Sequence, residues 1–203
     1  MYYFKVKWDS QANEPKPWHV DALVANEVIR PLLARCERDV ELWRFHRRAA
    51  PGGDGHRFSF HFYSTPATAK TVFASLDSDQ LLETLKASGV LERFDAEERD
   101  ASARGNITDD TEGSWPAEIQ KSWPYFIMGV SKMWLELVEQ VVQSMGSKPS
   151  SSSLDELKEF YERVHAEVTQ VWRFYGGHAF LHHLNAVFAY QQLLITPTFS
   201  ATF

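Results

Sequence analysis

The chain has 203 residues, of which 44% are hydrophobic and 24% charged, and its formal net charge is −6. This length and composition are typical of a globular protein with a sizeable core. The acidic balance disfavours general nucleic-acid binding, which usually requires a basic excess. The seven Trp and fourteen Phe are a heavy aromatic load. We expect most of them in the core and some along a pocket or an interface.

A single cysteine, Cys36, excludes an intramolecular disulfide and is typical of a reducing compartment. The first residues lack the basic-then-apolar layout of a signal peptide. No apolar run approaches the roughly 18 residues that a membrane span needs. We therefore expect a cytoplasmic protein that does not enter the membrane.

The first half of the chain predicts alternating strands and helices. Residues 2–8 alternate apolar and polar side chains, as in a strand with one face toward solvent. Apolar residues recur at helical spacing from about 19 to 36, with Asp21 as a candidate cap and Pro31 as a predicted kink. A β-hairpin follows at about 40–63, with a Pro/Gly/Asp turn.

The two faces of this hairpin differ sharply. Side chains alternate along a strand, so Phe58, Phe60 and Phe62 share one face. In the first strand, Trp43 and Phe45 likewise share a face. The opposite side chains are cationic or polar, which is typical of a surface where something anionic docks: Arg44, His46, Arg57, Ser59, His61 and Tyr63.

Helix and strand signals after the hairpin complete a recognisable order. Thr65 and Pro66 predict a helix start, and a second short helix covers 79–87 until Gly89 ends it. A last strand is expected at 90–94. The order β-α-β-β-α-β over residues 1–95 predicts an α+β fold built on a ferredoxin-like split βαβ layer. In such a layer the helices cover one sheet face, here the phenylalanine face, and leave the Arg/His face open.

Residues 96–114 form an acidic segment with few apolar side chains. Two interpretations stay open: a solvated loop, or a flap that folds toward the basic sheet face. Residues 115–203 predict a helical half that packs on the first half to give one compact domain overall. Its expected parts are a helix broken at Pro124 that ends near 145, a hinge at 146–153, a helix from 154 broken at Gly176-Gly177, a helix at 178–190, and a final strand or extended tail.

The open sheet face is the first candidate site, and Lys5 and Lys7 of the first strand add to its charge. Arginine offers a planar bidentate donor to carboxylate or phosphate, and histidine can move a proton near neutral pH. The alternative is that this face packs against the helical half or a second subunit, with its cations paired to the acidic segment.

The second candidate site is the stretch GGHAFLHHLNAVFAY. On a helix, His178, His182 and Asn185 share one face. Two histidines at this spacing could hold a metal, but no third ligand is placed nearby, so we expect an acid/base or hydrogen-bonded histidine and no metal. Motifs for nucleotide binding and for serine hydrolases are absent, and no cofactor is implied.

The hairpin and this helix together resemble the C-terminal elimination domain of lanthipeptide dehydratases and its relatives in thiopeptide-type bacteriocin biosynthesis. The pattern W-x-F-x-R-Y…D-P…H-x-R-x-R-F of that domain is matched loosely by Trp43–Arg48, the turn, and Arg57–Phe62. The likeness covers about residues 1–95 and 172–190. Ser59 and His61 stand where the family has two arginines.

The resemblance implies a lyase-type enzyme that matures a ribosomally made precursor peptide by elimination or a related acid/base step. Its partners would be that peptide or another biosynthetic enzyme. A different class stays open: a non-catalytic module that binds a peptide or partner through the open face or a sheet edge. A homodimer in which two sheet faces meet is the third alternative. The candidate catalytic residues are Arg47, His46, His61 and His182, and the candidate substrate-binding residues are Arg44, Arg57, Lys5, Ser59 and Asn185.

Overall fold

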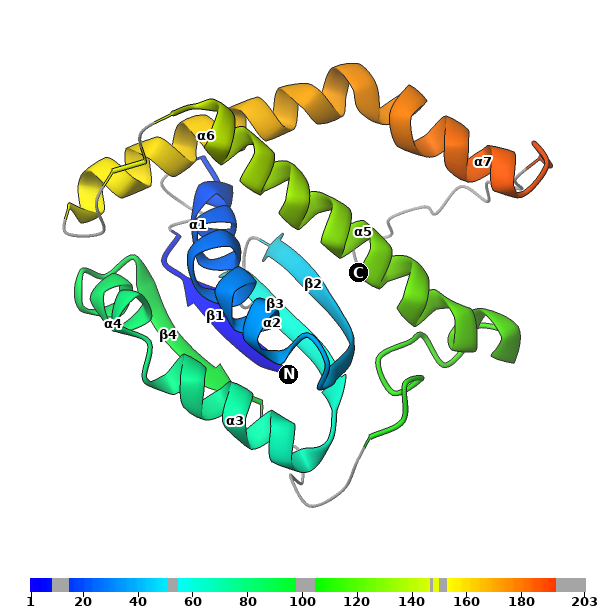
Figure 1. Ribbon diagram of the computed structural model, residues 1–203, viewed down its shortest axis with the longest axis horizontal. Coiled ribbons are helices and arrows are strands. Elements are labelled where there is room, and N and C mark those ends of the chain that lie inside the picture. The colour runs from blue at the N-terminus through cyan, green and yellow to red at the C-terminus, as the bar shows by residue number, and fades with distance from the viewer. Residues whose placement is uncertain (9–14, 51–54, 98–104, 147, 150–152, 193–203) are drawn as a thin grey trace, which may run out of the picture. The chain divides into compact units, whose positions relative to one another are not determined.

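The computed structural model describes residues 1–203 except 9–14, 51–54, 98–104, 147, 150–152 and 193–203 (Figure 1). The chain divides into two compact units, Met1–Ala166 and Glu167–Phe203, and each is described by itself. Among the described helices, none combines the length and apolar character that crossing a bilayer requires.

A four-stranded antiparallel sheet forms the centre of the first unit. Its strands are β1 (Tyr2–Val6), β2 (Val40–Ala50), β3 (Gly55–Ser64) and β4 (Leu91–Ala96), in the order β2-β3-β1-β4. Every neighbouring pair runs antiparallel. This order is the one expected of a split βαβ layer, so the predicted α+β, ferredoxin-like fold is confirmed.

The first crossover is helical, as predicted, but its irregularity lies in a different place. It consists of α1 (Trp18–Val24), a π-helical segment (Ala25–Ile29) and α2 (Arg30–Cys36). We expected a kink at Pro31, whereas the helix widens in the turn before it. Proline has no N–H to donate to the carbonyl four residues earlier, and a π-helical turn is one way in which the hydrogen-bond ladder adjusts.

The second crossover begins and ends where the sequence predicts. Thr65 Oγ1 accepts a hydrogen bond from the backbone N–H of Thr68 at 3.2 Å, which caps α3 (Pro66–Asp77). Asp79 accepts from two backbone N–H groups at the start of α4 (Gln80–Ala87). Gly89, with φ of +74°, provides the left-handed residue after α4.

The phenylalanine face of the sheet lies beneath these helices. Tyr2, Phe4, Phe58 and Phe60 are all 0% exposed. The ring of Trp18 in α1 lies 4.7 Å from the ring of His56 in β3, between centroids. Farther along the same face, α3 packs through the Phe73 ring on Tyr2 and Phe62. The expected division into a covered aromatic face and a second, polar face is therefore confirmed.

Helix α5 (Ala117–Ser144) runs beside β2 and covers this edge of the sheet (Figure 1). Ser131 Oγ accepts the backbone N–H of Phe45 at 3.1 Å, so this edge strand has a partner for that group. The Trp134 ring packs edge-on against the Phe45 ring. The predicted break at Pro124 is wrong: the proline is buried inside one continuous helix. Burial of Pro124 itself, and of Leu135, Val138, Val141 and Val142 farther along the helix, outweighs the loss of a single backbone hydrogen bond.

The predicted break at Gly176-Gly177 is also wrong. Helix α6 (Leu154–Gly176) continues into a π-helical segment (Gly177–His182) and then α7 (His183–Val187). A Cβ on Gly176 would lie 2.8 Å from the ring of Trp172. The glycine therefore makes room for a tryptophan one turn earlier on the same helix. The predicted strand or tail at the C-terminus lies outside the described residues from position 193 onward.

The first part of α6 belongs to the first unit and is anchored there by polar contacts. Asn26 Nδ2 donates to Tyr161 Oη at 3.0 Å, and Tyr161 in turn donates to Glu27. Asn26 and Glu27 both lie in the π-helical segment of the first crossover, so that segment holds α6.

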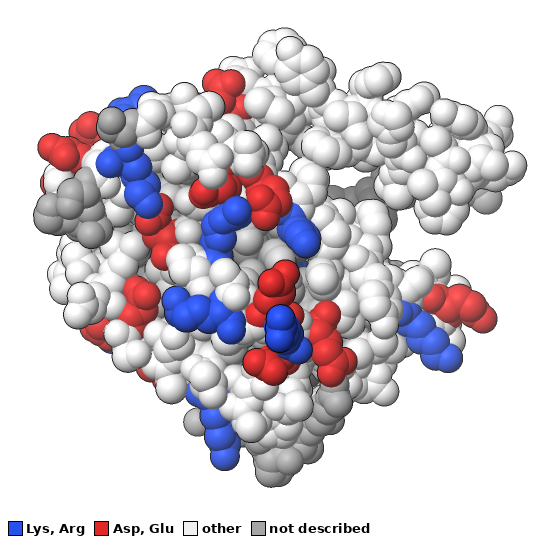
Figure 2. All heavy atoms as spheres, viewed as in Figure 1, with Lys and Arg blue, Asp and Glu red and all other residues white. Residues whose placement is uncertain are grey.

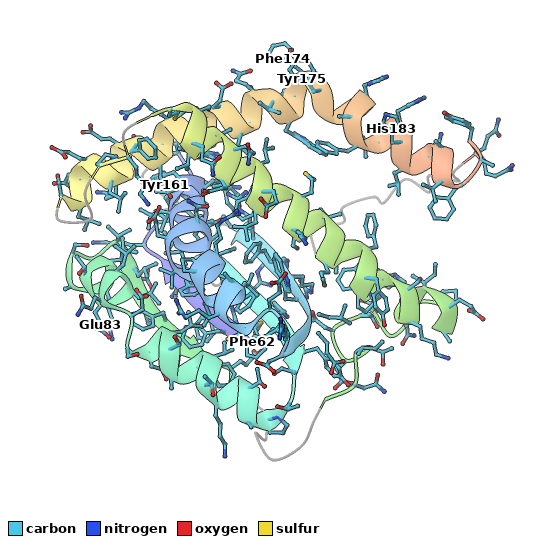
Figure 3. All side chains as sticks on the ribbon, viewed as in Figure 1. Phe62, Glu83, Tyr161, Phe174, Tyr175 and His183 are labelled. Carbon is cyan, nitrogen blue, oxygen red and sulfur yellow. The ribbon has the colours of Figure 1, made fainter. Side chains whose placement is uncertain are left out.

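The second unit has an apolar, weakly charged surface. Between residues 168 and 203, Arg173 is the only Asp, Glu, Lys or Arg. Phe174 and Tyr175 project from α6 with 77% and 65% of their surface exposed (Figure 3). On the visible face of the first unit, by contrast, acidic and basic side chains are interspersed (Figure 2).

Candidate functional site

The strand register brings the predicted polar residues together on one sheet face. Arg44 pairs with His61, and His46 pairs with Ser59. Since directly paired residues project to the same side, these four side chains share a face. β1 extends this face: Tyr3 and Lys5 lie beside Ser59 and Arg57.

An aspartate from the acidic segment joins this face. Asp110 Oδ2 lies 3.0 Å from His61 Nδ1 and also accepts a hydrogen bond from Arg44 Nε. Asp110 therefore lies against the basic sheet face, where the flap interpretation of the acidic segment predicts. The sequence analysis did not single out Asp110, because nothing local distinguishes it from the other carboxylates of the segment.

The electrostatics of this group favour a neutral histidine beside an ionised aspartate. Burial lowers the pKa of His61 below its ordinary value, and the charge of Arg44 adds to this effect, although the hydrogen bond to Asp110 opposes it. Burial alone would raise the pKa of Asp110. The hydrogen bonds from His61 and Arg44 outweigh that effect and hold the pKa far below its usual range.

The contact with Asp110 also sets the tautomer of His61. A carboxylate can only accept, so Nδ1 of His61 donates to it. The ring of a neutral histidine then has its lone pair on Nε2. This nitrogen is buried and has no hydrogen-bond partner among the described residues. An aspartate that orients a histidine in this way is the arrangement of a general base.

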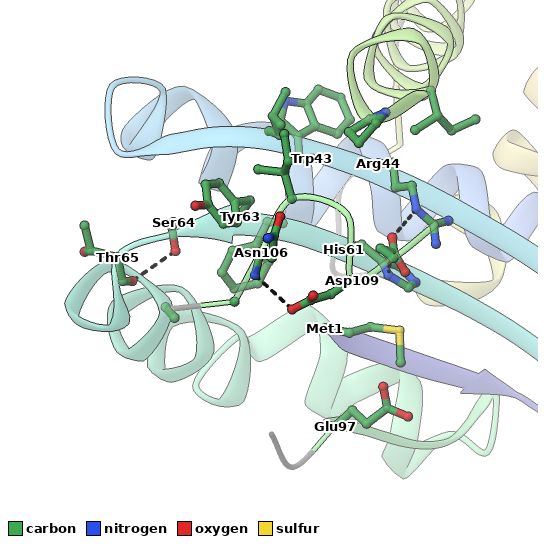
Figure 4. Close-up of a pocket in the computed structure, with 18 of the residues that line it drawn as sticks. Met1, Trp43, Arg44, His61, Tyr63, Ser64, Thr65, Glu97, Asn106 and Asp109 are labelled. Atoms are coloured by element: carbon green, nitrogen blue, oxygen red, sulfur yellow. Dashed lines mark hydrogen bonds and ion pairs between the residues drawn. The ribbon is translucent and has the colours of Figure 1, made fainter. Parts of the chain in front are cut away.

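Two pockets meet at this group, and Figure 4 shows the first of them. The first has a volume of about 240 Å³, and the second about 220 Å³. Arg44, His61 and Asp110 line both of them. The first is mainly apolar, and its walls include Leu42, Trp43, Phe62, Phe73, Trp123 and Ile127. The second is polar, and its walls include His46, Arg48, Arg57, Ser59 and Glu97.

The remaining predicted binding residues of this face have different surroundings. Arg57 stacks over the Tyr3 ring at 4.2 Å and lies 3.7 Å from a carboxylate oxygen of Glu97. Lys5 pairs with Glu92 at 2.9 Å and lines neither pocket. Burial, together with the charge of Arg44, lowers the pKa of His46 as well.

Arg47 lies on the opposite, covered face. Its Nε donates to Asp21 Oδ2 at 2.8 Å, and its guanidinium lies over the rings of Trp18 and Trp134. Asp21 Oδ1 is 2.8 Å from His56 Nε2, and the side chains of Asp21 and His56 are both 0% exposed. The prediction that Asp21 caps the helix is therefore wrong. Asp21 is the centre of a buried network. The structure therefore separates Arg47 from His46 and His61, the other predicted catalytic residues of the hairpin.

His182 and Asn185 belong to the second unit. The rings of His178 and His182 stack at 5.3 Å, and His182 Nε2 lies 3.3 Å from the hydroxyl of Tyr190. Asn185 is half-buried in α7. Across the described ranges, no group of three or more His, Cys, Asp or Glu side chains is arranged to hold a metal ion.

Comparisons of the chain with protein-family models, with curated proteins and with solved structures found no match.

Proposed function

We propose that this protein is an acid/base enzyme that acts on a ribosomally made precursor peptide, with His61 as the proton acceptor. The observation that carries the proposal is the state of His61. Its Nδ1 is held by Asp110, its pKa is lowered, and its Nε2 has no hydrogen-bond partner among the described residues. The ring also lines both pockets, so a ligand in either one lies beside it.

The reaction that agrees with this arrangement is a β-elimination. His61 would take the Cα proton of an O-acylated serine or threonine, and the Cβ–O bond would break to release a carboxylate. The double bond then forms between Cα and Cβ, and the proton stays on the imidazole. Arg44 and Arg57 would stabilise the departing carboxylate, as guanidinium groups do. The choice of a peptide substrate rests on the resemblance of the hairpin to the elimination domains.

The test is turnover of a synthetic peptide that contains O-glutamyl-serine, followed by the loss of glutamate in a mass spectrum. His61→Gln should abolish the product, while the peptide still binds. His46→Gln is the matched comparison, because the two rings lie 6.4 Å apart on the same face and only His61 has Nδ1 on Asp110. If His46→Gln alone loses activity, the base is His46 and our assignment is wrong.

A specific observation favours the alternative of a non-catalytic binding module. Asp110 already pairs with Arg44 and accepts a hydrogen bond from His61, as it would in a purely structural group. In that case the wild-type protein binds peptide and never releases glutamate. Binding without turnover, in the wild type and in both variants, would therefore overturn the catalytic proposal.

A further inference from the structure

We infer that the site recognises a ligand in which an anionic group is joined closely to an aromatic or branched apolar group, one on each side of His61. The inference deepens the proposed function, because it names the substrate class of the same site. In a peptide, such a ligand is an acylated or otherwise anionic residue next to an aromatic or branched side chain. The argument rests on the contrast between the two pockets.

The first pocket has the walls of an apolar subsite. Its aromatic residues Trp43, Phe62, Phe73 and Trp123 are only partly buried, so part of each ring faces the hollow. Covering such surface with a second apolar group is favourable. The volume of about 240 Å³ is smaller than the roughly 300–1,000 Å³ of pockets for drug-sized ligands. It therefore suits one side-chain-sized group.

The second pocket has the walls of an anion subsite. Three arginines line it, Arg44, Arg48 and Arg57, against the two carboxylates of Asp110 and Glu97. Burial and neighbouring cations lower the pKa of His46 and His61, so neither ring carries a positive charge near neutral pH. Arg44 and Arg57 each have five N–H donors, more than their contacts with Asp110 and Glu97 use, so donors remain for a ligand anion, and Ser59 adds a hydroxyl.

Arg44 forms the boundary between the two subsites. Its guanidinium lies 5.2 Å from the Trp123 ring centroid, and Trp123 lines the apolar pocket. Arg44 and His61 line both pockets. Met1, Glu97 and Asp110 line both pockets as well, so a ligand that fills both subsites crosses a junction of which the proposed base is one wall.

The test compares indole-3-acetate with its two halves, indole and acetate, in NMR titrations of the full chain. Histidine ring signals follow the anion subsite and tryptophan Nε1 signals follow the apolar one. Indole-3-acetate should bind at least about tenfold more tightly than either half, because burying an aromatic group contributes that much or more. If its affinity only equals that of the better half, the inference is overturned.

Matched variants assign each half to its pocket. Ala69→Leu fills the apolar pocket and should reduce indole-3-acetate binding to the level of acetate, whereas Ala67→Leu changes the same helix outside the pocket and should not. Arg57→Gln should reduce binding to the level of indole. Arg93→Gln is its control, because Arg93 also stacks on Tyr3 but lines neither pocket.

If a pocket variant and its control change the affinity for indole-3-acetate equally, in either pair, the inference is overturned. If Ala69→Leu does not fold, Ile127→Phe narrows the same pocket from α5. The affinity pattern without any turnover would refute the proposed function and support the inference. Turnover of the peptide without the affinity pattern would support the proposed function and refute the inference.

Discussion

Replacing Asp21 by asparagine should destabilise the protein by about 3 kcal/mol. The carboxylate is 0% exposed and accepts one hydrogen bond from Arg47 and one from His56, both at 2.8 Å. An asparagine of the same shape can accept only one of them, and its amide then points its own donors at the other partner. Breaking a buried ion pair by removing one partner costs about 3–5 kcal/mol. The lower end applies because 24% of the Arg47 side chain is exposed and water can reach it.

Urea unfolding of the wild type and Asp21→Asn measures this difference. Asp39→Asn is the control, since Asp39 is exposed at the end of the first crossover and its loss should change the free energy of unfolding by less than about 0.5 kcal/mol. In a double-mutant cycle with Arg47→Leu, the two losses should not add. A change below about 1 kcal/mol for Asp21→Asn, or full additivity in the cycle, would refute the idea that this network stabilises the fold.

Three further changes have defined outcomes. Asp110→Asn should lower the pKa of His61 further, because both the hydrogen bond and the charge of Asp110 raise it, and the NMR titration of the His61 ring measures the shift. Burial, then the charge of Arg47, lower the pKa of His165 from 6.5 to about 4, so the folded state binds this proton less readily than the unfolded state. Stability should therefore fall as the pH decreases from 6.5 to about 4, and urea unfolding of His165→Gln should show a weaker dependence on pH. Ser131→Ala should cost about 1–3 kcal/mol in thermal unfolding, because it leaves the buried N–H of Phe45 without an acceptor.

Local patterns in the sequence were sufficient to predict much of the fold. Period-two alternation gives the two faces of the hairpin, and the register of β2 and β3 follows it from Leu42 onward, after a shift between Val40 and Leu42. The predicted cap at Thr65 is likewise local, since its side chain bonds to an N–H group three residues later, and Asp79, which we placed inside the next helix, caps it in the same way. Interactions of this range are encoded in a few neighbouring residues, and a single sequence displays them.

Interactions between distant residues could not be predicted in the same way. Asp110 meets Arg44 across 66 positions of the chain, and its segment offers several other carboxylates that could have done so. Pro124 and Gly176 were misjudged for a related reason: their local preference is to end a helix, and packing against other residues decides otherwise. At Pro124 tertiary burial outweighs the local preference, and at Gly176 the packing of the Trp172 ring from the same helix does so.

The hairpin presents two groups of the same chemical composition, one on each face. Asp110 meets Arg44 and His61 on the open face, and Asp21 meets Arg47 and His56 on the covered face.

In each group, one ring nitrogen of the histidine is buried without a hydrogen-bond partner among the described residues. Residue types and distances alone therefore do not distinguish a site from a structural network. Exposure of the ring does: the His61 side chain is 16% exposed and lines both pockets, whereas that of His56 is 0% exposed and lines neither. This difference is why we propose chemistry at His61, and a stabilising role for His56 and for Arg47, which contact the same Asp21.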